Sequence, residues 1–276
     1  MVRIRTSLPD VPDWALRREC DGAFWGAAAP GGNSTVGLSP LHFTLQTIST
    51  QAPHGRVRPV VVVIGSPVGL LRDEEVVPTG TPAGVALAAA EAGREVQLVG
   101  RTGDDPTADG LLLSLARRGV GHVALLRDPS RPTALAQEPQ LGDAGPASPD
   151  DVAAPAPESS PVPALDAADV ELGLRYLTTF AVVVLAERAG QEVVRVVADA
   201  ARWNGAQLVM VVAAGTEPPD GLPPDAIVFE APVEDPDGDF AALVGRFAAA
   251  LDDGADAADA FRTSIAAEGW TEAAVD

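Results

Sequence analysis

The run from Val60 to Ala134 constrains the fold of this chain most strongly, because short apolar stretches alternate there with helix-forming stretches. The stretch VVVVIG ends at Gly65, as a buried parallel strand does, and two further strand patterns and two helix patterns follow it. The helices are predicted at 82–92 and 105–118, and the later strands at 95–100 and 122–126. This order predicts right-handed crossovers and a mainly parallel sheet covered by helices.

A segment of different composition interrupts the alternation of strand and helix patterns. Residues 137–164 are rich in Pro, Ala, Ser and acids and have no apolar period, which predicts a flexible linker that proteases cut first. Strands are then predicted at 180–186, 206–214 and 226–231, and helices at 166–177, 191–203, 240–251 and 257–268. We therefore expect an α/β domain over 57–276 that is interrupted by this linker.

Residues 1–56 do not fit this pattern and are predicted to be a partly irregular N-terminal extension. A short helix is expected over 13–20, with Asp13 as its cap. The extension contains Trp14, Phe24, Trp25 and Phe43, although aromatic residues make up only 4% of the chain. We expect these side chains to dock on the main domain or on a partner chain.

Composition excludes several classes of function. The net charge of −20 disfavours nucleic acid and anionic membranes as partners. All 19 basic residues are arginine, so a P-loop lysine or a Schiff-base lysine is excluded. Cys20 is the only cysteine and there are three histidines, which disfavours a metal site or a histidine-centred triad. No apolar stretch approaches the about 18 residues of a membrane helix, and we expect a cytoplasmic protein.

Residues 60–134 resemble the ribokinase-like, or PfkB, carbohydrate kinases, and they include the stretches PTGTPAGVALAAAEAG (78–93) and GRTGDDPTADGLLLSLARRGV (100–120). The resemblance extends more loosely through 165–231 and 234–265. It implies an α/β three-layer sandwich with a mainly parallel sheet flanked by helices, and a substrate site at the carboxyl ends of the strands. The second stretch contains Asp104 and Asp105, which are interpreted as capping and turn residues of the next helix.

The substrate positions implied by the resemblance are degenerate. Where the family has an aspartate about five residues after a strand-end glycine, this chain has Leu70 after Gly65. Asp73 is an alternative, less favoured acid at that place. In the family's glycine pair with a downstream asparagine, Gly80 is retained, but Gly84 replaces the amide. These positions keep the scaffold and lose the side chains that would bind substrate hydroxyls.

The lid and the anion hole also depart from the family's pattern. PTALA (132–136) resembles the start of the lid, but the proline-rich segment follows it, so we expect the lid strands to be missing. At the anion hole, Gly238 and Asp239 match the last two residues of the GAGD motif, whose aspartate is the catalytic base. Pro236, which lacks an N–H, and Asp237, which adds negative charge, replace the first two. Several strands that precede this motif in the family are absent, so the chain resembles a truncated member.

Two functions remain open from the sequence. The first is a degenerate, non-catalytic ribokinase-like protein with a binding or structural role, which would need no cofactor and would bind a protein partner or a second copy. The alternative is a divergent kinase that uses Mg²⁺ and ATP to phosphorylate a sugar or nucleoside, with Asp239 as base and Gly238 in the anion hole. The simpler interpretation of Asp239 is an acid that favours the helix dipole. A nicotinamide-binding site is disfavoured, because Gly65 and Gly69 do not have the G-x-G-x-x-G spacing.

Overall fold

The computed structural model describes the backbone of residues 3–6 and the whole of residues 60–73, 75–136, 165–177, 179–233 and 235–267. The predicted linker over 137–164 and the extension from residue 7 onward, with its expected helix, lie outside the described residues. Residues 3–6 were expected to belong to the extension, but they form the edge strand β1 (Arg3–Thr6) of the main sheet, antiparallel to β10. Four residues are too few for a strand pattern in the sequence, so only the pairing partner reveals this strand.

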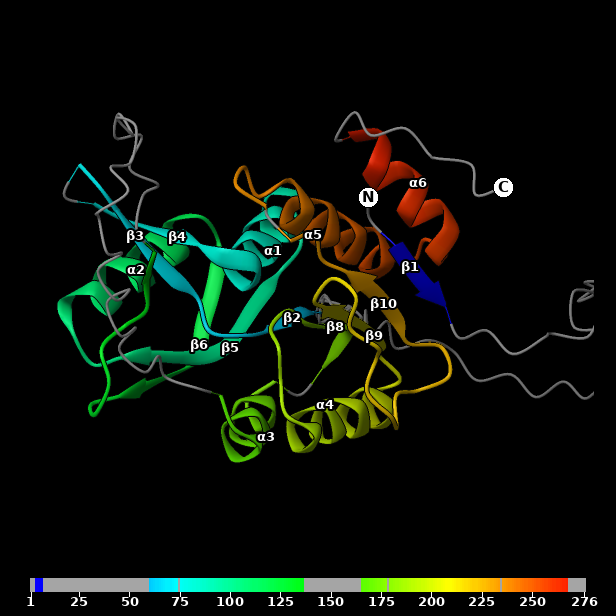
Figure 1. The fold of residues 1–276 in the computed structure, drawn as a ribbon, viewed down its shortest axis with the longest axis horizontal. Helices are drawn as coiled ribbons and strands as arrows, with labels where there is room; N and C mark the ends of the chain where they lie inside the picture. The colour runs from blue at the N-terminus through cyan, green and yellow to red at the C-terminus, as the bar shows by residue number, and fades with distance from the viewer. Residues whose placement is uncertain are drawn as a thin grey trace, which may run out of the picture. The chain divides into compact units, whose positions relative to one another are not determined.

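The main sheet has seven strands in the order β1-β10-β9-β8-β2-β5-β6, six of them parallel (Figure 1). Its parallel strands are β2 (Val60–Ile64), β5 (Val96–Gly103), β6 (Val120–Asp128), β8 (Phe180–Leu185), β9 (Gln207–Val212) and β10 (Ile227–Glu230). The chain builds outward from β2 through β5 to β6, and then returns to build β8, β9 and β10 on the other side of β2. The strand order therefore reverses between β2 and β8, and α/β sheets bind ligands at the carboxyl end of such a point.

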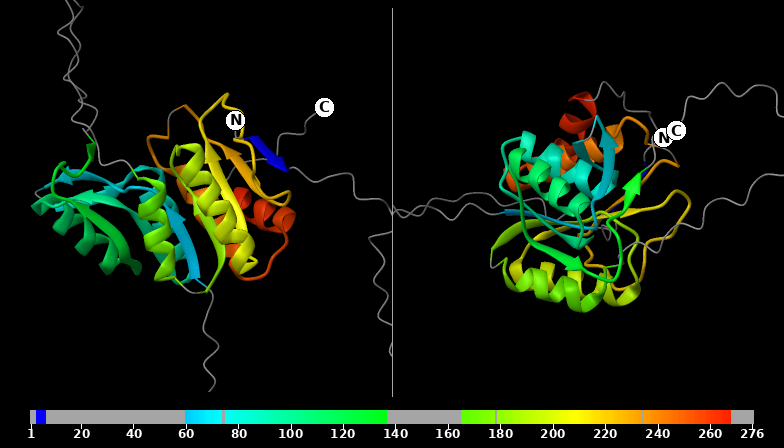
Figure 2. Two further views of the ribbon diagram at one scale, coloured as in Figure 1. Left: turned by 90° about the horizontal axis from the view of Figure 1, so that it is seen from below. Right: turned by 90° about the vertical axis from the view of Figure 1, so that its left-hand side faces the viewer.

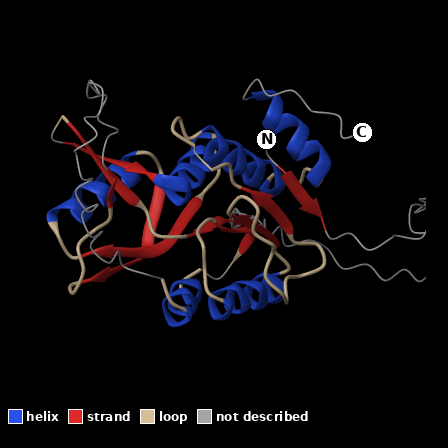
Figure 3. Ribbon diagram, viewed as in Figure 1, coloured by secondary structure: helices blue, strands red, loops and turns tan. Residues whose placement is uncertain are grey.

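Helices cover both faces of this sheet (Figures 2 and 3). One face packs on α1 (Gly80–Glu91), α2 (Pro106–Arg117), α5 (Asp239–Asp252) and α6 (Ala257–Ala267), and the other on α3 (Ala167–Arg175) and α4 (Gln191–Asn204). The alternation within β2 explains the two layers, because Val61 and Val63 belong to the first core and Val62 and Ile64 to the second. The predicted three-layer α/β sandwich is confirmed, and every helix predicted within the described residues is present.

A second, smaller sheet was not predicted from the sequence. Its strands are β3 (Val68–Arg72), β4 (Glu75–Thr79) and β7 (Leu135–Ala136), in the order β4-β3-β7. The strand β7 lies within PTALA, where the lid was expected to start, and it pairs in parallel with β3. The β3–β4 hairpin was not predicted, because its turn at Asp73 (φ 46°) is not a glycine-marked turn and its strands are only five residues long.

Candidate functional site

The loop before α5 contains a carboxylate that binds the N-terminus of that helix. The Asp235 carboxylate accepts hydrogen bonds from the backbone N–H groups of Phe240 (3.1 Å) and Ala241 (3.2 Å). Gly238 is the residue before the helix and has a left-handed backbone (φ 78°), which turns the chain so that Asp235 reaches these donors. Two of the backbone donors at this helix end, those of Phe240 and Ala241, are therefore already used by a carboxylate of the same chain.

The two residues matched to the family's anion hole and base lie at this loop. Asp239 is the first residue of α5 and is exposed to solvent, a position in which a carboxylate favours the helix dipole. Gly238 lines a cavity of about 500 Å³ between this loop, α1 and the small sheet. The acids that line the cavity are Glu91, Asp235 and Asp237, and no arginine lines it among the described residues. The loop does not fit a bound triphosphate, because its carboxylates would repel the ligand's negative charge.

The cavity brings together some of the predicted substrate positions and leaves others out. Gly80 and Gly84 line it together with Gly238, as the resemblance implies for the two halves of one site. Gly65 and Leu70 do not line it. Leu70 is half-buried in the middle strand of the small sheet, where it pairs with Val77 and Ala136, so it contributes apolar packing.

Gly84 is held as glycine by helix packing. A Cβ at position 84 would lie 2.7 Å from the Cβ of Ala241, because α5 crosses α1 at this point. A second close approach occurs one turn further along α5, where a Cβ at Gly245 would lie 2.5 Å from the carbonyl oxygen of Val85. The amide that the family places at this position would not fit unless α5 moved away from α1.

A second polar cluster lies at the point where the strand order reverses. Gly65 follows β2, and the next residue, Ser66, donates its backbone N–H to the Glu187 carboxylate at 2.7 Å. Glu187 follows β8, so these two residues bridge the carboxyl ends of β2 and β8. The Ser66 hydroxyl also accepts a hydrogen bond from the backbone N–H of Arg101, in β5, at 3.2 Å. A side chain at Gly65 would lie 2.6 Å from Pro82, which explains the glycine there.

The environment of Glu187 perturbs its ionisation. Burial raises the pKa of the Glu187 carboxyl above its ordinary value, and the hydrogen bonds from Ser66 only partly oppose this. A carboxyl with a raised pKa at a strand-order reversal is a candidate functional group. Our sequence analysis missed it. The available signal was an acid directly after the buried strand FAVVVLA.

Asp105 has the structural role predicted for it. Its carboxylate accepts the backbone N–H of Ala108 (2.9 Å) as the cap of α2, and the backbone N–H and hydroxyl of Thr133 at 2.7 and 2.8 Å. Burial of the carboxyl acts to raise its pKa, but these hydrogen bonds outweigh it and hold the pKa of Asp105 below its ordinary value. Asp105 therefore joins the start of α2 to the segment that leads into β7. Asp104 pairs instead with Arg127 (3.1 Å) at the surface.

An ion pair fixes α3 against the carboxyl end of β5. The Arg101 guanidinium makes two contacts of 2.9 Å with the Asp169 carboxylate, which is buried. Asp169 also completes a reciprocal cap at the start of α3 with Asp166. This pair positions a helix at the rim of the strand ends. In the described part of the chain, no group of three or more His, Cys, Asp or Glu side chains is arranged to hold a metal ion.

Comparison with known proteins agrees with this architecture. Residues 61–148 match the model of the pfkB family carbohydrate kinases. No curated protein matches the chain. A PfkB protein from Polaromonas sp. JS666 superposes with a TM-score of 0.53 at 15% identity, over 76% of this chain and 96% of that one. A protein described as ribokinase II from E. coli, solved in complex with ATP and Mg²⁺, gives 0.52 at 14% identity, over 76% and 91%.

These comparisons define a class of fold rather than an activity. The resemblance predicted from the sequence is confirmed for residues 61–148, and the superpositions show a ribokinase-like fold for the described domain. None of the helices in the described ranges has the length and apolarity needed to cross a bilayer.

Proposed function

We propose that this chain is a ribokinase-like protein that does not transfer phosphoryl groups and that functions by binding a protein partner or by a structural role. The observation that carries the proposal is the contact of Asp235 with the backbone N–H groups of Phe240 and Ala241. Phosphoryl transfer depends on preorganised donors that stabilise negative charge as it develops. Two of the N–H donors at the start of α5 are instead satisfied by a carboxylate in the resting protein.

The state of the neighbouring positions supports the same proposal. Gly84 supplies no amide, Leu70 supplies no hydroxyl acceptor, and Asp237 adds a further charge beside the place where a phosphate would bind. Another side chain could take over any one of these functions. Gly84 and Asp237 line the cavity, whereas Leu70 lies in the small sheet outside it, so the losses affect both the cavity and the position matched to the family's acid. The remaining acid, Asp239, then has no aligned reactants on which to act as a base.

The test is a pair of measurements on the full chain. We expect no phosphorylation of ribose, fructose or a nucleoside with Mg²⁺ and ATP above the level of a reaction without protein. We also expect ATP or ADP with Mg²⁺ at millimolar concentration to leave the melting temperature unchanged, because a ligand raises it only by binding the native state. Turnover that is lost in Asp239→Asn would overturn the proposal.

A divergent kinase is the second candidate, and one observation favours it. Asp239 is exposed at the start of α5 and directly follows Gly238, which lines the cavity, although Asp239 itself does not line it. A base has to lie near a bound substrate hydroxyl, and this position is close to the cavity. Under this alternative Mg²⁺ and ATP supply the phosphoryl group, and a sugar or nucleoside is the acceptor. Asp235 would then have to release α5 when the nucleotide binds. A nucleotide-dependent rise in melting temperature that is larger in Asp235→Ala than in the wild type would support this candidate.

A further inference from the structure

A small pocket lies on the face of the sheet that α1, α5 and α6 cover. Its volume is about 230 Å³, and it is bounded by the end of α1, the second half of α5 and the end of α6. Of these three helices, α5 lies in the middle (Figure 1). The apolar lining consists of alanines, which are Ala92, Ala249, Ala250 and Ala267. Because alanine side chains are short, a bulky apolar group from elsewhere would bury its surface in this space.

The chain passes this pocket as it leaves α6. Ala267, the last residue of that helix, lines the pocket, and so do Thr263 and Ser264 one turn earlier. Residues 268–276, with the sequence EGWTEAAVD, follow directly and lie outside the described residues. Trp270 is the only aromatic residue among them. Three residues of chain span up to about 10 Å, so Trp270 is within reach of the pocket.

Three other helices of this chain end in a way that turns the chain back on the helix. After α1, α2 and α5, one residue separates the helix from a glycine with a left-handed backbone (φ 82°, 81° and 92°), namely Gly93, Gly119 and Gly254. The residue after the glycine then donates its N–H to a carbonyl five residues earlier, from Arg94 to Ala89 (3.2 Å) and from Ala255 to Ala250 (3.0 Å). After α2 that residue is the apolar Val120, which is buried. An apolar residue at this place commonly packs on the last turn of the helix.

The sequence after α6 has the same spacing. One residue separates the end of the helix from Gly269, and the residue after this glycine is Trp270. If α6 ends as the other three helices do, the Trp270 N–H reaches the carbonyl of Ile265 and the indole packs on the last turn. Ser264 of that turn lines the pocket. The sequence pattern therefore directs the Trp270 side chain toward the pocket.

The charges around the pocket suit the residues beside Trp270. Among the described residues, Arg94 and Arg246 line it together with one acid, Asp253, although the whole chain has 39 acids and 19 bases. Arg94 contacts Asp253 at 2.8 Å, and the Arg94 side chain keeps 25% exposure. The segment 268–276 contains three acids and no base. An acidic segment is attracted to this locally basic rim, whereas a surface of net negative charge repels it elsewhere.

We propose that residues 268–276 dock on the same chain, with the Trp270 side chain in the pocket between α1, α5 and α6. The docked segment ties the end of α6 to the two helices that bring Gly84 against Ala241, and it stabilises their packing. The proposal does not depend on the absence of catalysis, because this pocket shares no lining residue with the cavity beside Gly238. A kinase activity in the wild type would therefore leave it standing.

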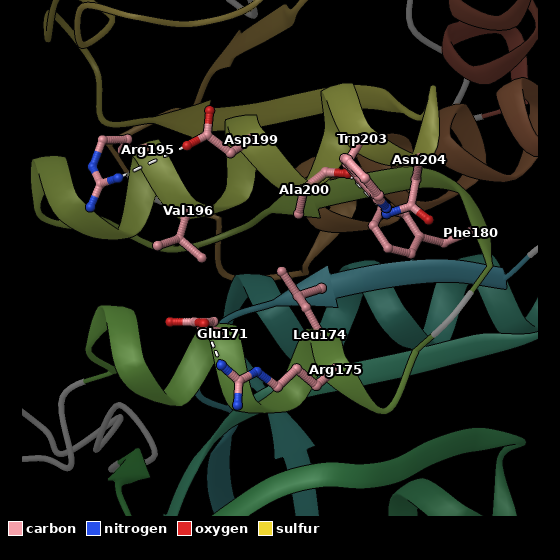
Figure 4. Close-up of a pocket in the computed structure, with 10 residues that line it drawn as sticks. All are labelled: Glu171, Leu174, Arg175, Phe180, Arg195, Val196, Asp199, Ala200, Trp203 and Asn204. Atoms are coloured by element: carbon pink, nitrogen blue, oxygen red, sulfur yellow. Dashed lines mark hydrogen bonds and ion pairs between the residues drawn. The ribbon is translucent and has the colours of Figure 1, made fainter.

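The first experiment measures how strongly acrylamide quenches the fluorescence of Trp270 in the full chain, with Trp14, Trp25 and Trp203 replaced by Phe. A second variant keeps Trp203 alone as the exposed reference. The Trp203 side chain is 90% exposed at the end of α4, beside a groove on the opposite face of the sheet (Figure 4). A pocket covers about 70% or more of its occupant, so we expect Trp270 to be quenched at least about threefold less than Trp203. Equal quenching of the two would overturn the proposal.

A blocking variant tests where the segment docks. Ala92→Phe places a large side chain on the pocket wall and should raise the quenching of Trp270 to the level of Trp203. Ala258→Phe is the matched control, because Ala258 is also exposed but lies on α6 outside the pocket. If Trp270 stays protected in Ala92→Phe, the pocket is not its docking site. Protection that appears only as the protein concentration rises would assign the pocket to a second copy and would also contradict the proposal.

The second experiment compares the thermal stability of two tryptophan variants of the full chain. Trp270→Ala removes the side chain that fills the pocket, and we expect the melting temperature to fall by about 2–4 °C, the shift that a modest loss of packing produces in a domain of this size. Trp203→Ala is the matched control and should leave the melting temperature unchanged, because Trp203 is exposed. A melting temperature that is the same in Trp270→Ala as in the wild type would refute the docking of this segment.

Discussion

Gly84 and Ala241 lie so close together that a Cβ on the glycine would come within 2.7 Å of the alanine Cβ. The first residue belongs to the helix that would carry substrate-binding groups, and the second belongs to the helix that would carry the base. The close packing of α5 on α1 at this contact leaves no room for a side chain at position 84, so it also explains why the amide is absent there. Restoring the family's residue would therefore disturb the fold before it could restore any binding.

Replacement of Gly84 by Asn tests this relationship. We expect Gly84→Asn to lower the free energy of unfolding by about 1–3 kcal/mol, the usual range for an added side chain in a packed interface. Urea denaturation monitored by circular dichroism measures the change. Gly190→Asn is the control, because nothing lies within 4 Å of a Cβ there and the residue caps α4, where Asn is favourable. Equal stability of the two variants would contradict this expectation and would mean that α5 can move away from α1 at little cost in free energy.

Asp235 should stabilise α5 as a cap. Asp235→Ala leaves the N–H groups of Phe240 and Ala241 without their acceptor, and we expect a loss of about 1 kcal/mol in the free energy of unfolding. Asp237→Ala removes an acid from the same loop and should change the free energy of unfolding much less. Asp237 is exposed, and in this variant the N–H groups of Phe240 and Ala241 still donate to the Asp235 carboxylate. A thermal melt of both variants in one buffer makes the comparison. If Asp237→Ala proves the more destabilising, the capping role of Asp235 is wrong.

Asp105 should make stability depend on acid pH. Its folded-state pKa is lowered, so the stability it contributes is complete above the ordinary aspartate pKa of 3.8 and is lost as the pH falls through the lower folded value. We expect Asp105→Asn to cost about 1 kcal/mol at neutral pH, through the weakened cap and the weakened bonds to Thr133. The difference in the free energy of unfolding between Asp105→Asn and the wild type should become smaller at a pH well below 3.8. A gap that is constant with pH, measured by urea denaturation, would contradict this assignment.

Glu187 should make the protein less stable as the pH rises, which is the opposite of the effect of Asp105. Its folded-state pKa is raised, so its favourable contribution is present below the ordinary glutamate pKa of 4.5 and is lost as the pH rises through the higher folded value. We therefore expect Glu187→Gln to raise the melting temperature at neutral pH, where the wild type buries a charged carboxylate, and to raise it less near pH 4.5. The Gln side chain can still accept the bond from Ser66. A variant that is less stable than the wild type at neutral pH would mean that the charge itself is needed there.

The helices and parallel strands of the main sheet follow from local sequence, whereas β1 and the β3–β4 hairpin do not. Strands such as VVVVI and FAVVVL are continuous apolar runs that bury both faces, and the helix at 106–117 is marked by Asp105 before it and Gly119 after it. These signals lie within a few residues of the structure they specify, so the order of strands and helices, and with it the parallel sheet, could be predicted. The losses at Leu70, Gly84 and Pro236 were also visible, because they are identities at matched positions.

Contacts between distant residues were decided only by the tertiary structure. Ser66 and Glu187 are 121 positions apart and meet because β2 and β8 are neighbours at the reversal of strand order. Asp235 was one acid among several in its loop, and only the backbone turn at Gly238 directs it to α5. Local periodicity in the sequence determines which side chains are buried, whereas the partner of a polar group depends on where non-local packing brings the chain.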